Sequence, residues 1–76
     1  MFDIVVSILG EYQNIAKEQI HADSQLVSDL GLSSFDLVSL VGRFEDEFEI
    51  EIPDRQIKKL NTVGDVVDLI ESIKDK

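Results

Sequence analysis

Apolar residues recur every three or four positions in three stretches of the chain, which is the spacing of helices with one buried side. The first stretch predicts a helix over about residues 2–17, with a stripe of Phe2, Val5, Val6, Leu9, Tyr12 and Ala16. The second predicts a helix that begins at Ser33 or Ser34, with a buried stripe of Leu37, Val38, Leu40, Val41, Phe44 and Phe48. The third predicts a last helix with a stripe of Val63, Val66, Val67, Ile70 and Ile73.

Both later helices begin with a capping-box pattern, in which a Ser or Thr caps the helix and an acid three residues later bonds back to it. Ser33 and Asp36 form one such pair, and Thr62 and Asp65 form the other. Gly42 lies inside the second helix, where it costs about 1 kcal/mol relative to alanine. The apolar pattern around Gly42 is long enough for the helix to be predicted despite that cost.

The segments between these helices have no helical period. Residues 18–32 predict a long loop, which is held on the core by scattered aliphatic side chains, namely Ile20, Leu26, Leu30 and Leu32. Glu49–Ile52 alternates like a strand, but Pro53 ends it and no second strand can pair with it, so we expect an extended connector. A short helical turn should follow to about Leu60, with Asp54 as its cap. The predicted fold is all-α: a small bundle of three principal helices plus one short helix.

Size and composition narrow the possible functions. Seventy-six residues support one domain, over residues 1–76, and the chain has no cysteine and only one histidine, His21, in the predicted loop. We therefore expect no catalytic residue, no metal site and no enzymatic activity. The net charge of −9 opposes binding to nucleic acid. The short apolar run at Met1–Leu9 contains an acid and lacks a basic start, so we expect no membrane insertion and a cytoplasmic location.

Two serines stand where a loop that contains Gly31 enters the second helix. A hydroxyl in the first turn of a helix is exposed, and the unpaired N–H groups and positive end of the helix dipole there suit a phosphodiester. A simpler interpretation is that Ser33 and Ser34 only cap the helix. The physical argument does not choose between the two serines.

The segment Asp29-Leu30-Gly31-Leu32-Ser33-Ser34-Phe35-Asp36 resembles the acyl carrier protein family, and the likeness continues to about residue 70. The resemblance implies a carrier of acyl groups, bound as thioesters to a 4'-phosphopantetheine arm. In the family the modified serine lies three residues after the glycine and just before an apolar residue, which selects Ser34. One departure is Ser33, where the family usually has Asp.

The resemblance also implies partners. These are a phosphopantetheinyl transferase and the enzymes of fatty-acid or polyketide-type synthesis, whose basic patches would dock onto a monomeric acidic carrier. The implied docking residues are Phe35, Asp36, Glu45 and Asp46. Burial of Phe35 in the core and a purely solvated acidic surface are the simpler interpretations. The cargo stays open, since aminoacyl and D-alanyl carriers share the pattern, and an unmodified acidic interaction module is a further alternative.

Overall fold

The computed structural model describes residues 1–75 and consists of helices joined by loops. Its elements are α1 (Phe2–Gln13), a 3₁₀ turn η1 (Lys17–Gln19), α2 (Ser34–Phe48), α3 (Asp54–Ile57) and α4 (Val63–Lys74). No strand forms in the described part of the chain, where an isolated backbone bridge joins Gln25 to Thr62. Three long helices and one short helix confirm the predicted all-α fold.

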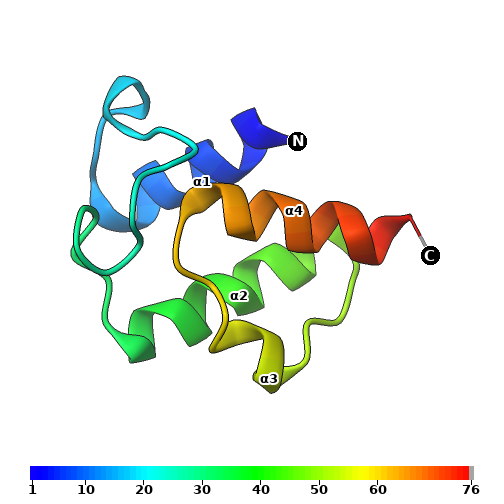
Figure 1. Cartoon of the computed structure of the whole chain (residues 1–76). Coiled ribbons are helices and arrows are strands. Elements are labelled where there is room, and N and C mark those ends of the chain that lie inside the picture. The colour runs from blue at the N-terminus through cyan, green and yellow to red at the C-terminus, as the bar shows by residue number, and fades with distance from the viewer. Residues whose placement is uncertain (76) are drawn as a thin grey trace.

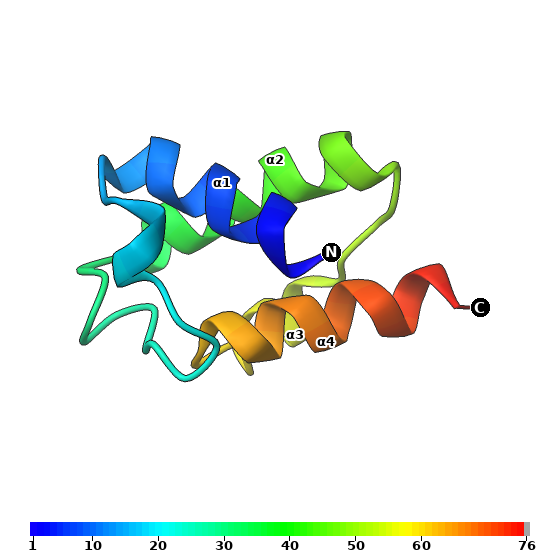
Figure 2. The same ribbon diagram turned by 90° about the horizontal axis from the view of Figure 1, so that it is seen from above.

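The three long helices lie along one common direction (Figure 1). α1 runs from the N-terminus toward the long loop, and α2 and α4 both run back from the loop, so the N-terminus and the end of α4 lie at the same end of the molecule (Figure 2). α1 packs against both α2 and α4, whereas α3 packs against α2. The loop of residues 20–33 and the first turn of α2 therefore lie at the opposite end from both termini.

The core is aliphatic and includes the long loop. Its most fully buried large side chains include Phe44, Leu9 and Leu40 from the helices and Leu26 and Leu32 from the loop. All four loop side chains predicted to hold the loop on the core are buried, namely Ile20, Leu26, Leu30 and Leu32. Backbone hydrogen bonds add to this attachment, since the Leu26 N–H donates to the Asn61 carbonyl at 2.8 Å and the Gly64 N–H to the Ala22 carbonyl at 2.8 Å.

Three predicted helix boundaries are wrong. α1 ends at Gln13 and not near residue 17, because Asn14 adopts the left-handed conformation with φ 57° and the Ile15 N–H donates back to the Gly10 carbonyl at 3.0 Å. Asn tolerates this conformation better than most residues, so it ends the helix although the apolar spacing continues to Ala16. At α3 the N-cap is Pro53 and not Asp54, and the helix ends at Ile57.

The predicted stripe of α2 is also wrong at one position. Val38 is 59 % exposed, whereas Leu40, Val41 and Phe44 are buried. At 3.6 residues per turn, Val38 lies about 100° around the helix from Leu37, so it falls beside the buried stripe and not within it. The capping boxes at Ser33 and Thr62 form as predicted.

We expect Gly42→Ala to stabilise the domain by about 1 kcal/mol, because alanine has the higher helix propensity. A Cβ built at Gly42 has no atom within 4 Å, so the methyl group adds no clash. Urea unfolding followed by far-UV circular dichroism measures the change. Gly31→Ala is the matched control and should destabilise, because Gly31 has φ +71°. A lower midpoint for Gly42→Ala would contradict the expectation.

Candidate functional site

The start of α2 is fixed by reciprocal hydrogen bonds between Ser33 and Asp36. Ser33 is the N-cap, and its Oγ accepts from the Asp36 N–H at 3.2 Å. In return, Asp36 Oδ2 accepts from the Ser33 N–H at 3.0 Å and from the Ser33 hydroxyl at 3.1 Å. Gly31 allows the chain to turn into this cap, because its φ of +71° is easily adopted only by glycine. The cap makes Ser34 the first residue of α2.

A long-range contact completes this network. The hydroxyl of Tyr12 in α1 donates to Asp36 Oδ1 at 2.9 Å, so both carboxylate oxygens of Asp36 accept hydrogen bonds. The Ser33 N–H is the main reason why the pKa of Asp36 is lowered from its usual value, and the Tyr12 hydroxyl is the next. The same contact raises the pKa of Tyr12. The carboxylate therefore stays ionised and joins α1 to the start of α2.

The structure distinguishes the two serines between which the physical argument from the sequence did not choose and the family resemblance selected Ser34. The Ser33 hydroxyl both accepts from and donates to Asp36, so it is held by the cap. Ser34 is exposed, and its hydroxyl forms no hydrogen bond to any group within residues 1–75. Of the two, only the Ser34 hydroxyl can be modified without breaking the cap.

A groove of about 660 Å³ lies beside Ser34, between α2 and α3. Its lining includes Val27 of the loop, Leu37 and Val38 of α2, Ile57 of α3 and Lys58, the C-cap of α3. Sequence reasoning did not assign Val27, Val38 or Lys58 to a site. For Val38 a signal was present, because it lies four residues after Ser34 and therefore on the same side of the helix.

Exposed apolar side chains surround the same serine. Phe35 is 77 % exposed, and Val27 and Val38, which line the groove with Ser34, are 58 % and 59 % exposed. This settles the position of Phe35, which is not part of the core. Apolar side chains gathered in this way beside a reactive group are typical of a contact surface for another molecule.

The three candidate acids of α2, Asp36, Glu45 and Asp46, do not form one free surface. Asp36 is held by Ser33 and Tyr12, and Glu45 Oε2 accepts from the Ile52 N–H at 2.7 Å, which fixes the connector after α2. Both are half-buried, whereas Asp46 and its neighbour Glu47 are exposed. Within residues 1–75 no three acids or histidines are grouped so that they could hold a metal ion.

Comparison with known proteins assigns the chain to a family. Residues 3–70 match the family model described as a phosphopantetheine attachment site. The chain is 41 % identical to the acyl carrier protein of Sulfurovum sp. strain NBC37-1 over 96 % of this chain and 97 % of that protein. It is 43 % identical to the acyl carrier protein of Wolinella succinogenes over 97 % of both chains.

The fold agrees with a solved member of the family. The crystal structure of the acyl carrier protein from Thermotoga maritima superimposes with a TM-score of 0.83 at 30 % identity, over 96 % of this chain and 85 % of that chain. Among residues 1–75 no helix is both long enough and apolar enough to cross a membrane. The family model, the relatives and the fold together show that this chain belongs to the acyl carrier protein family, whose members bear a covalent phosphopantetheine group.

Proposed function

We propose that the Oγ of Ser34 is the attachment atom for 4'-phosphopantetheine, and that the chain acts as a single carrier domain for acyl groups. The observation that carries this proposal is the contrast between the two serines, since the Ser34 hydroxyl is exposed and unbonded while that of Ser33 belongs to the cap. The first turn of α2 favours the negative phosphodiester electrostatically. The attached group supplies the thiol on which acyl groups are held as thioesters.

Activation of the Ser34 hydroxyl falls to a partner enzyme. The single histidine of the chain, His21, is an exposed loop residue, and the nearest carboxylate along the helix, Asp36, is engaged by Ser33 and Tyr12. A phosphopantetheinyl transferase would therefore supply the base that removes the proton from Ser34. In this scheme the chain is a carrier and not a catalyst.

The groove beside Ser34 favours an apolar acyl cargo. Five aliphatic side chains line it: Val27, Leu37, Val38, Ile57 and Leu60. Burial of a methylene group in such a lining gains about 0.8 kcal/mol. This favours fatty-acyl or polyketide-type intermediates over aminoacyl and D-alanyl groups, which are too short and polar to use it.

Docking of partners would use the exposed residues of α2. Phe35 supplies an apolar contact next to Ser34, and Asp46 supplies a free charge near the other end of the helix. Asp36 and Glu45 add negative charge to the same helix while their carboxylates hold the fold. Transferase and synthase enzymes with basic patches fit this surface, and the carrier would meet them as a monomer.

We expect Ser34→Ala to abolish the mass gain of one phosphopantetheinyl group after incubation with a transferase and coenzyme A. Ser33→Ala should still gain that mass, because its hydroxyl serves only the cap. Loss of the cap should lower stability by about 0.5–2 kcal/mol. Intact-protein mass spectrometry and urea unfolding measure the two effects. An arm mapped to Ser33, or wild-type protein that several transferases leave unmodified, would refute the proposal.

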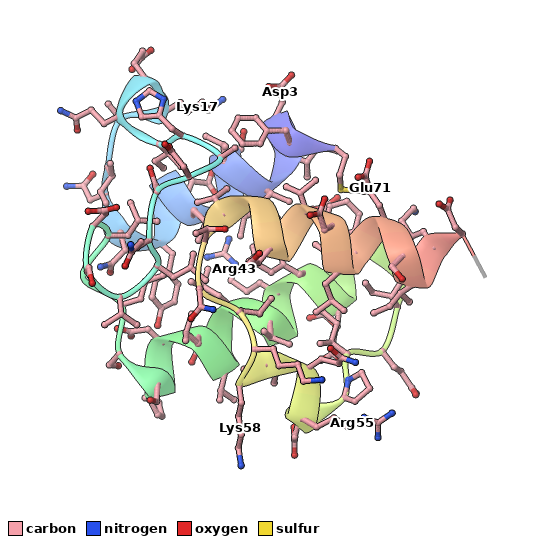
Figure 3. The ribbon with its side chains drawn as sticks, in the orientation of Figure 1. Asp3, Lys17, Arg43, Arg55, Lys58 and Glu71 are labelled. Carbon is pink, nitrogen blue, oxygen red and sulfur yellow. The ribbon has the colours of Figure 1, made fainter. Side chains whose placement is uncertain are left out.

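We expect Asp46→Lys to slow modification about fivefold at low salt, since it replaces an attraction to a basic partner by a repulsion. Glu45 is left intact, because its carboxylate holds Ile52. Glu71→Lys is the matched control: Glu71 is an exposed acid on α4 and lies away from the start of α2 (Figure 3). Steady-state transferase kinetics distinguish the two variants. Equal modification rates for the two variants would show that Asp46 is not part of the docking surface.

A further inference from the structure

Three of the seven basic residues of this acidic chain lie in α3 or just after it. The sequence holds sixteen acids and seven bases, yet residues 54–59 contain Arg55, Lys58 and Lys59 against a single acid, Asp54. All three bases are exposed. Within residues 1–75 the only salt bridge joins Arg43 to Glu11, so none of the three has a carboxylate within 4 Å. Lys59 shares a hollow with the acids Asp65 and Asp68, so the exposed positive surface consists of Arg55 and Lys58.

This positive surface adjoins the attachment serine. Lys58 lines the same groove as Ser34, and α3 packs against α2. Arg55 and Lys58 both extend from α3 into solvent on the side away from α1 (Figure 3). An enzyme that encloses Ser34 must therefore approach Lys58 closely as well.

The negative charge of the docking surface lies farther from the serine. Asp46 and Glu47 are exposed near the end of α2, and twelve residues of helix place Asp46 about 18 Å from Ser34 along the axis. A partner on this surface thus meets positive charge beside the groove and negative charge toward the end of α2. A uniformly basic partner would press its own cations against Lys58 and Arg55, where Asp54 is the one acid within residues 54–59, and this costs binding energy.

We propose that α3 is a second docking surface of opposite sign, and that the enzymes acting at Ser34 carry acidic side chains opposite Arg55 and Lys58. Basic side chains of the same enzymes lie opposite Asp46 and Glu47. Two patches of opposite sign fix the orientation of the carrier on the enzyme, because turning it end for end brings like charges together. The proposal rests on the proposed function, since it assumes that enzymes act on Ser34.

The test compares Lys58→Glu with Lys17→Glu, using the phosphopantetheinyl transferase encoded by the same genome and coenzyme A. Both lysines are exposed and both variants change the net charge equally, but Lys17 lies on the opposite side of the bundle from α3 (Figure 3). We expect kcat/KM to fall about fivefold for Lys58→Glu, through KM, and to change less than about twofold for Lys17→Glu. The difference in kcat/KM between the two variants should disappear at about 0.5 M NaCl, where exposed charges are screened.

Arg55→Glu is a second test of the same surface. Arg55 lies inside the four-residue α3 and Lys58 caps its end, so the two variants change the charge at two different backbone positions. Both should raise KM if the partner is acidic there. Modification of either variant as fast as that of Lys17→Glu, or faster, overturns the proposal. Wild-type protein that gains no mass would instead refute the proposed function.

Discussion

The carboxylate of Asp36 accepts hydrogen bonds from three donors, and the geometry of the site depends on them. Two come from Ser33, so the loop enters α2 at one fixed residue. The third comes from Tyr12, which ties that entry point to α1, the helix packed against α2. Without this carboxylate the Ser33 N–H would lose its acceptor, and the Tyr12 hydroxyl of α1 would lose its hydrogen bond to the start of α2. The exposure of Ser34 therefore follows from a residue that need not touch any ligand.

The long loop is the second condition for the site. A loop of this length is usually mobile or functional. Here four of its aliphatic side chains are as fully buried as the core side chains of the helices. Leu26 and Leu32 are each 1 % exposed, and they bracket the exposed Val27. The loop can present the Val27 side chain to the groove because Leu26 and Leu32 hold the loop on the core.

Features set by neighbouring residues were predictable, and features set by distant ones were not. Both capping boxes and the buried loop residues follow from short patterns, and so does the place where α2 begins. The end of α1 could not be predicted in this way, because the apolar periodicity carries no information on the left-handed conformation of Asn14. Tyr12 was read as one more apolar residue, since its partner Asp36 lies twenty-four residues away. The groove needed α3 placed against α2, and no local pattern gives that contact.

Charge on this protein serves two separate purposes, and composition alone does not distinguish them. Of the acids on α2, Asp36 and Glu45 bind backbone N–H groups and so maintain the fold, whereas Asp46 and Glu47 remain available to a partner. The net charge of −9 suggests a uniformly acidic surface, yet Lys58 lines the same groove as Ser34. Under the proposed docking scheme, partner choice depends on the few charges that the fold leaves unpaired near Ser34, and their placement matters more than their sum.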